Sequence, residues 1–253
     1  MIKLKNVYKR FEGSRTHAVE NVNLSVRKGE LLGLIGESGC GKTTTLKLIN
    51  RLEEPSQGDI LVAGENIRKH RPEQLRRNIG YVFQGIGLFP HRTIEENVAA
   101  VPELLGWEPE QIRRRCNEML NLVGLSRSEY GARNPTDLSG GQQQRVGVAR
   151  ALAAKPEVML MDEPFGALDP ITRAGLQDEF KNIQLQLGLT VIMVTHDMTE
   201  ALLMADRIAV MRNGRILQLG TPAELLNDPA DDYVQEFVDM PRRRAERLEQ
   251  LMN

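Results

Sequence analysis

The sequence predicts an α/β fold in which a sheet layer carries some antiparallel additions and a helical insertion. Short, largely apolar runs, typical of buried parallel strands, occur at residues 30–35, 158–161 and 190–194. Segments that alternate apolar and polar side chains lie near the N-terminus. Between Gln84 and Lys155 no strand pattern appears, so we expect this stretch to be a helical insertion in the α/β core.

The composition is that of a globular chain without a strong charge bias. The 253 residues, 41% apolar and 26% charged, can bury one large core or two small ones. The net charge of −1 provides no basic field that would attract nucleic acid, so we expect no nucleic-acid partner. No apolar run approaches the roughly 18–20 residues of a membrane span. Met1–Lys5 lacks the apolar core of a signal peptide.

Residues Gly36–Thr43 fit the pattern G-x-x-x-x-G-K-[ST], the phosphate-binding loop of nucleotide hydrolases. A strand is expected before the loop, and a helix is expected after it, from Thr43 to Leu52. Glycines let backbone N–H groups turn toward an anion, and the helix N-terminus adds partial positive charge. Lys42 can reach the β- and γ-phosphates, and the Thr43 hydroxyl can bind Mg²⁺. The alternative, a chance glycine-rich turn, is disfavoured by the flanking strand and helix.

The two cysteines, Cys40 and Cys116, favour a reducing compartment, the cytoplasm. Cys40 lies inside the phosphate loop, so a structural disulfide is not expected. We interpret it as a small loop residue without chemistry of its own.

The strands and turns around the loop are predicted from the alternation of apolar and polar residues and from residues typical of turns. Tyr8 and Phe11 follow the first strand pattern, and they suggest a surface on which an adenine ring could stack. Packing of an edge strand is the alternative for both. A hairpin is predicted around Asn213-Gly214, and Thr221 with Glu224 predicts a capped helix start. The other predicted strands lie at residues 2–7, 22–26, 59–62, 79–83, 208–211 and 216–219.

Within the insertion, Thr93 and Glu96 form a capping box that predicts a helix start. A second helix is expected over Pro109–Val123, with Gly124 as its stop. Leu138–Gln142 then places a serine and two glycines at the start of another helix, which makes a second candidate anion site. Because one nucleotide loop does not need a second phosphate cradle in the same chain, this site could serve another copy's nucleotide.

Acidic and polar residues follow two of the buried strands, where α/β sheets carry their ligands. Asp162 is placed to hold Mg²⁺ and Glu163 to accept a proton from water. His196 follows the strand at 190–194; a catalytic role is favoured over a structural one. Asp169 and Pro170 start a helix that is expected to end at Gly188. The tail, residues 241–253, is predicted to be a charged helix without assignable chemistry.

These motifs together resemble the ATP-binding subunits of ABC transporters, over essentially the whole chain. Gly36–Thr43 matches Walker A, Val158–Glu163 matches Walker B, and Leu138–Gln142 is the complete LSGGQ signature. Smaller family marks fall at Gln84 (the Q-loop), Ala167-Leu168-Asp169 (the D-loop) and His196 (the switch histidine).

The resemblance implies a P-loop NTPase fold: a RecA-like core with an antiparallel β subdomain and an inserted α-helical subdomain. It divides a single ABC ATPase domain, residues 1–253, into three parts. These are the core with its β subdomain at 1–84 and 156–220, the helical subdomain with the signature at 85–155, and a C-terminal helical tail at 221–253.

The resemblance also implies ATP hydrolysis with Mg²⁺. Glu163 would polarise the attacking water, His196 would contact the γ-phosphate, and Asp169 would link the two sites of a dimer; Lys42 and Gln84 complete the catalytic set. Phe11, with Tyr8 in reserve, falls at the adenine-stacking position. The Mg²⁺ ligands would be Thr43, Gln84 and Asp162. The implied ATP contacts are Phe11, Gly36, Glu37, Ser38, Gly39, Cys40, Gly41, Lys42, Thr43, Thr44 and Gln84, with Ser139, Gly140, Gly141 and Gln142 reaching the partner's γ-phosphate.

In this family two subunits face head to tail, so the expected partners are a second ATPase subunit, transmembrane permease subunits and, indirectly, a substrate-binding protein. The expected location is the cytoplasmic face of the cell membrane. The segment Phe83–Val98 is similar to that of osmoprotectant importers, which carry quaternary amines such as glycine betaine, carnitine and choline. The alternatives are an ABC ATPase for another solute, such as an amino acid-like one, or a non-transport ABC ATPase in envelope remodelling.

Overall fold

The computed structural model describes residues 1–85 and 87–252, and the chain forms two compact units. The first unit combines Met1–Asn66 with Ile192–Asn253, and the second is Ile67–Val191. Ile86 in the predicted insertion and Asn253 in the predicted tail lie outside the described residues. The three-part division expected from the family pattern remains a prediction beside these two units.

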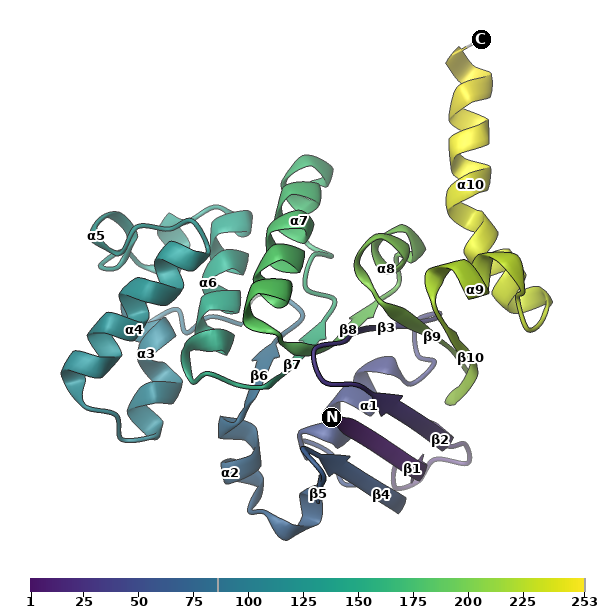
Figure 1. Cartoon of the computed structure of the whole chain (residues 1–253), viewed down its shortest axis with the longest axis horizontal. Coiled ribbons are helices and arrows are strands. Elements are labelled where there is room, and N and C mark those ends of the chain that lie inside the picture. The colour runs from purple at the N-terminus through teal and green to yellow at the C-terminus, as the bar shows by residue number, and fades with distance from the viewer. Residues whose placement is uncertain (86, 253) are drawn as a thin grey trace. The chain divides into compact units, whose positions relative to one another are not determined.

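An antiparallel sheet in the first unit has the strand order β2-β1-β4-β5 (Figure 1). One of its two inner strands, β1, is not strictly alternating, because the pairing with β2 shifts register between Leu4 and Val7. Asn6 has a φ of 48° there, which produces the irregularity and leaves Ile2, Leu4 and Val7 buried. The strands are β1 (Ile2–Lys9), β2 (Val19–Val26), β4 (Gln57–Val62) and β5 (Glu65–Asn66).

The strand that leads into the phosphate loop, β3 (Leu31–Ile35), is buried at every residue. It runs parallel to β9 (Arg207–Arg212), which forms an antiparallel hairpin with β10 (Arg215–Gly220). Asn213 and Gly214 have φ angles of 49° and 79°, as a two-residue hairpin turn of the predicted kind requires. The predicted hairpin is therefore confirmed.

The helices of the first unit are α1, α8, α9 and α10. The Thr221–Glu224 capping box opens α9, as predicted. Helix α10 begins before the predicted tail helix and continues through Pro241, and it packs against α8 and α9. The bounds are α1 (Lys42–Ile49), α8 (Met198–Met204), α9 (Pro222–Asn227) and α10 (Asp232–Met252).

The second unit contains the parallel pair β6 and β7, with α6 packed on β6. The strand β8 (Thr190–Thr195) begins in this unit and ends in the first. Short helical segments precede β6, and the sequence patterns did not predict them. The elements before the insertion and after it are η1 (Ile67–Lys69), α2 (Pro72–Arg77), β6 (Ile79–Val82), β7 (Val158–Asp162) and α7 (Pro170–Leu187).

The insertion is helical, as predicted: the described residues between Gln84 and Lys155 contain no strand. Helices α3, α4 and α6 pack against one another (Figure 1). The Thr93 hydroxyl accepts from the Glu96 N–H at 3.2 Å, and the Glu96 carboxylate accepts from the Thr93 N–H at 2.7 Å, so the capping box is confirmed. The elements are α3 (Ile94–Leu104), α4 (Pro109–Leu122), α5 (Arg127–Tyr130), η2 (Pro135–Asp137) and α6 (Gly140–Ala153).

Candidate nucleotide site

The phosphate loop connects β3 to α1 and is shaped by two glycines that cannot carry a side chain. A Cβ at Gly36 would lie 2.2 Å from the Met211 carbonyl oxygen, and one at Gly41 would lie 2.3 Å from the Ala18 carbonyl oxygen. Gly41 also has a φ of 108°, a conformation that favours glycine. The loop backbone is therefore pressed against β9 and the residue before β2, and this fixes the direction of its N–H groups.

Lys42 is the first residue of α1 and is buried. Its ammonium group is hydrogen-bonded to the loop itself. Its Nζ donates to the carbonyl oxygens of Gly36 at 2.7 Å and Glu37 at 2.9 Å. No side chain of the described residues caps the N-terminus of α1. An uncapped helix start beside a lysine in a glycine cradle fits a bound phosphate chain.

The other predicted loop residues differ in exposure. Glu37, Ser38 and Gly39 are exposed, Cys40 is buried, and Thr43 and Thr44 are half-buried at the start of α1. Burial raises the pKa of the Cys40 thiol, so this group stays protonated. That agrees with its interpretation as a small loop residue.

The two candidate adenine-stacking residues have different surroundings. Phe11 is 41% exposed, and the Lys9 ammonium lies 4.8 Å from the centre of its ring. The Tyr8 ring instead packs edge-on against His17 at 5.7 Å. The exposed face of Phe11 supports its choice over Tyr8, and the stacking itself stays a prediction.

The acidic end of β7 brings two predicted catalytic residues together in the second unit. The Gln84 side-chain N–H group donates to the Glu163 carboxylate at 3.2 Å. Asp162 is buried at the end of the strand, and Glu163 has a φ of 45°, a left-handed conformation unusual for this residue type. Burial raises the pKa of Tyr81, and the Asp162 charge adds to that rise. The Asp162 carboxylate and the Gln84 amide oxygen are of the type that Mg²⁺ prefers, and so is the hydroxyl of Thr43 in the first unit.

The signature segment opens α6 with its polar groups bonded to one another. The Ser139 hydroxyl accepts from the Gln142 N–H at 3.3 Å, and the Gln142 side chain accepts from the Ser139 N–H at 3.0 Å. A Cβ at Gly141 would lie 2.6 Å from the Thr172 methyl group, whereas one at Gly140 would meet only Leu168 at 3.8 Å. Gly141 thus has a packing reason within the chain, and Gly140 does not.

The remaining predicted residues, Asp169 and His196, lie in different units. The Asp169 carboxylate accepts from the Thr172 N–H at 3.0 Å at the start of α7, as its predicted capping role requires. Hydrogen bonding by Thr172 holds the pKa of Asp169 below its usual range. His196 directly follows β8 and is exposed.

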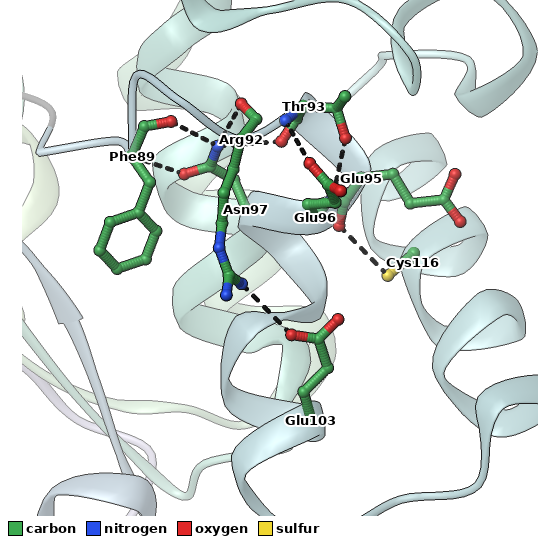
Figure 2. Close-up of polar contacts among 8 residues, drawn as sticks. All are labelled: Phe89, Arg92, Thr93, Glu95, Glu96, Asn97, Glu103 and Cys116. Carbon is green, nitrogen blue, oxygen red and sulfur yellow. Dashed lines mark hydrogen bonds and ion pairs between the residues drawn. The ribbon is translucent and has the colours of Figure 1, made fainter.

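The loop between β6 and α3 is fixed by a side chain that the motifs did not single out. Asn97 is fully buried in α3; its carbonyl oxygen accepts from the Phe89 N–H at 2.8 Å. Its amide N–H groups donate to the carbonyl oxygens of Phe89, Arg92 and Thr93, at 2.9 to 3.1 Å (Figure 2). This loop carries Phe89, a residue that is 42% exposed, and the Arg150 guanidinium lies 5.5 Å from the centre of its ring. No sequence motif marks Asn97, and its burial as a polar residue is seen only in the structure.

The described residues contain neither a helix that is long and apolar enough to cross a membrane nor a cluster of three or more His, Cys, Asp or Glu side chains arranged around a metal.

Comparison with known proteins identifies the family. The family model described as "ABC transporter" matches residues 19–166, more than half of the chain. The chain belongs to the ABC transporter family. This agrees with the resemblance of its motifs, and it makes the chain an ATP-binding ATPase cassette with the P-loop NTPase fold.

Two relatives of this cassette come from Bacillus subtilis (strain 168). The "Choline transport ATP-binding protein OpuBA" is 54% identical over 100% of the chain and 68% of its own length. The "Glycine betaine/carnitine/choline transport ATP-binding protein OpuCA" is also 54% identical, over 100% of the chain and 67% of its own length. The cassette therefore spans about two thirds of these relatives.

A solved structure supports the same fold. The "dimeric structure of a post-hydrolysis state of the ATP-binding cassette MJ0796 bound to ADP and Pi" aligns with a TM-score of 0.78 and 35% identity. The alignment covers 88% of this chain and 99% of that one.

Proposed function

We propose that the cassette hydrolyses ATP in a head-to-tail dimer and so powers an importer of a quaternary amine, namely glycine betaine, carnitine or choline. The Gln84–Glu163 hydrogen bond carries the enzymatic part, because it holds a carboxylate in place at the end of a buried strand. The 54% identity to a choline and to a glycine betaine/carnitine/choline transport protein supports the solute class.

In the first unit, binding would be the task of the phosphate loop. Lys42 would leave its two carbonyl partners and pair with the phosphates, while loop N–H groups hold the phosphate oxygens. Phe11 would support the adenine ring, and His196 would contact the γ-phosphate and the water. Positioning and neutralisation of charge are the main requirements of phosphoryl transfer.

In the second unit, the Glu163 carboxylate would accept a hydrogen bond from the attacking water and so orient it. The Gln84 side chain would hold that carboxylate in place. The Mg²⁺ ligands proposed are Gln84 and Asp162 in this unit and Thr43 in the first unit. When bound, that ion neutralises charge on the phosphate oxygens.

The variant Glu163→Gln tests this assignment, because it keeps the size of the side chain and removes its charge. We expect ATP binding to be retained and turnover to fall about 10²–10⁴-fold. Glu73→Gln on α2 makes the same change of charge in the same unit and should leave turnover unchanged. Near-normal turnover of Glu163→Gln would remove Glu163 from this role.

The dimer assignment gives the signature its purpose: Ser139, Gly140, Gly141 and Gln142 would cover the γ-phosphate bound by a second copy, and Asp169 would link the two sites. Hydrolysis per subunit should then rise with protein concentration over the range in which the chain dimerises. Hydrolysis that is independent of concentration over that range would contradict the two-copy site.

We place the cassette at the cytoplasmic face of the membrane, bound to transmembrane permease subunits through the segment 83–98. Phe89 and Pro90 are exposed and Leu88 is half-buried, which leaves part of this segment available to a partner. A photocrosslinker at Phe89 in the assembled transporter should label the permease. Labelling confined to the same chain would contradict the docking role.

A reconstituted transporter tests the solute. Glycine betaine, carnitine and choline should each be assayed for ATP-dependent uptake, with spermidine as a cation that lacks a quaternary nitrogen. Uptake of at least one quaternary amine, lost in the Glu163→Gln transporter, is expected. Transport of none of them would favour another solute or an ABC ATPase in envelope remodelling.

A further inference from the structure

The turn between β9 and β10 is hydrogen-bonded to two distant segments of the first unit. Its second residue, Gly214, donates its N–H to the Cys40 carbonyl oxygen of the phosphate loop at 2.9 Å. The Gly214 carbonyl oxygen accepts from the N–H of Glu20, in β2, at 2.8 Å. Both backbone polar groups of one residue therefore join the phosphate loop to the start of β2.

The start of β2 is also the end of the loop that carries Phe11, residues 10–18, which we call the Phe11 loop. This loop is closed at its base, where the Ala18 N–H donates to the Lys9 carbonyl oxygen at 2.8 Å. Inside it, the Ser14 N–H donates to the Phe11 carbonyl oxygen at 3.1 Å. The Lys9 ammonium lies 4.8 Å from the centre of the Phe11 ring. The position of Phe11 is thus tied to the base of its loop.

At that base, the Ala18 carbonyl group fits against two glycines. A Cβ at Gly41 would lie 2.3 Å from the Ala18 oxygen, and one at Gly214 would lie 3.1 Å from it. The glycines are themselves close, since a Cβ at Gly41 would lie 3.5 Å from the Gly214 Cα. We call these contacts of Ala18, Gly41 and Gly214 the Gly214 junction. They are made by backbone atoms, so a flexible side chain does not absorb a change in spacing there.

The Gly214 junction connects the two places in this unit where parts of one nucleotide would bind. The phosphate loop fits a phosphate chain, and Phe11 presents an exposed ring for an adenine. The phosphates and the base of ATP are linked covalently, so both places can be occupied together only at a suitable spacing. A spacing that is already correct in the free protein lowers the cost of binding the whole nucleotide.

We propose that Gly214 is a positioning residue that holds the Phe11 loop at the spacing from the phosphate loop that ATP requires. The Gly214 junction then determines how strongly the chain prefers ATP to inorganic tripolyphosphate, which has the phosphates and lacks the base. This inference rests on the proposed binding of ATP at the phosphate loop and on the proposed stacking of adenine on Phe11.

The variant Gly214→Ala would displace the Phe11 loop. Its Cβ would approach the carbonyl oxygens of Ala18 and His17 at 3.1 and 3.2 Å, so the base of the Phe11 loop must move by a few tenths of an ångström. We expect Mg·ATP to bind about 5–10-fold more weakly and tripolyphosphate to change by less than about 2-fold. Calorimetric titration with the two ligands measures both constants. Losses of equal size for the two ligands would overturn the proposal.

Gly64→Ala is the matched control, because Gly64 is the second residue of the turn between β4 and β5. Its φ of 85° is close to the 79° of Gly214, but a Cβ there meets nothing within 4 Å. The control carries the same backbone strain without the contact, and it should leave both affinities unchanged. An equal fall in the preference for ATP in Gly64→Ala would overturn the proposal.

A second variant, Gly214→Asn, separates the contact from the strain. Asn adopts a positive φ more readily than Ala, so this variant keeps the turn folded and still carries the Cβ. We expect the same fall in the preference for ATP as in Gly214→Ala. A preference restored to that of the parent would assign the effect to strain and overturn the proposal.

A double-mutant cycle tests whether Gly214 acts through Phe11. In Phe11→Ala the stacking ring is already absent, so adding Gly214→Ala should weaken ATP binding by no more than about 2-fold. A loss as large as in the parent would overturn the proposal. A parent that binds neither ligand would instead contradict the proposed nucleotide site, and an unchanged preference in Phe11→Ala would contradict the proposed stacking.

Discussion

Two helix starts in this chain carry glycines after a polar turn, and the structure treats them differently. The phosphate loop leaves α1 without a side-chain cap and keeps a lysine beside it. The signature closes α6 with a capping box between Ser139 and Gln142. Similar compositions thus give one helix end that is open to an anion and one that satisfies its own end groups.

The glycines differ in the same way. Gly41 is required by its own φ and by the Ala18 carbonyl, and Gly141 is required by the neighbouring Thr172. Gly140 has neither constraint. Of two adjacent glycines at one helix start, therefore, one is required by packing within the chain and the other is not.

The largest effect is expected for Gly41→Ala, which would break the open site. Its Cβ would meet a backbone oxygen at 2.3 Å, so the loop must move. We expect an unfolding free energy lower by more than about 2 kcal/mol and ATP affinity about 100-fold lower. Gly39→Ala is the matched control, since it shares a positive φ but meets nothing within 4 Å. Chemical denaturation measures the unfolding free energy, and nucleotide titration measures the ATP affinity. Similar losses of these quantities in the two variants would refute the close-approach argument.

A smaller effect is expected for Gly141→Ala. The new Cβ would approach the Thr172 methyl at 2.6 Å, which should lower the unfolding free energy by about 1–3 kcal/mol. Adding Thr172→Ser removes that methyl and should restore most of the loss. Gly140→Ala should leave stability nearly unchanged. If Gly140→Ala were as destabilising as Gly141→Ala, the division of roles within the pair would be wrong.

The smallest effect is expected for Ser139→Ala, which removes the cap of α6. The expected loss of unfolding free energy is about 1 kcal/mol. Ser38→Ala in the phosphate loop should have an effect within about 0.5 kcal/mol, because Ser38 is exposed and α1 has no side-chain cap. Equal losses measured by urea denaturation would mean that the two helix starts do not differ as described.

Much of the site was predictable from local chemistry. The glycine loop, the capping boxes at Thr93 and Thr221 and the cap at Asp169 depend on residues three or four positions apart, so the sequence displays them directly. The family marks added Gln84, and in the structure its side chain donates a hydrogen bond to the Glu163 carboxylate.

The rest depends on contacts between residues far apart in the chain. Nothing in the sequence around Asn97 indicates that its amide will hold the Phe89 loop. The bulge at Asn6 was hidden because a strand pattern assumes regular pairing. The roles of individual residues in ATP and Mg²⁺ binding stay predictions, because they depend on contacts with molecules other than the chain.

The left-handed backbone of Glu163 has a consequence for the evolution of this position. A non-glycine residue in that conformation costs about 1–2 kcal/mol, so glycine would be favoured there by thermal stability alone. A library of variants that is screened for heat resistance should therefore lose the glutamate. A library that is screened for growth dependent on ATP-driven uptake should retain it. Under the role proposed for Glu163, stability and catalysis therefore favour different residues at this position.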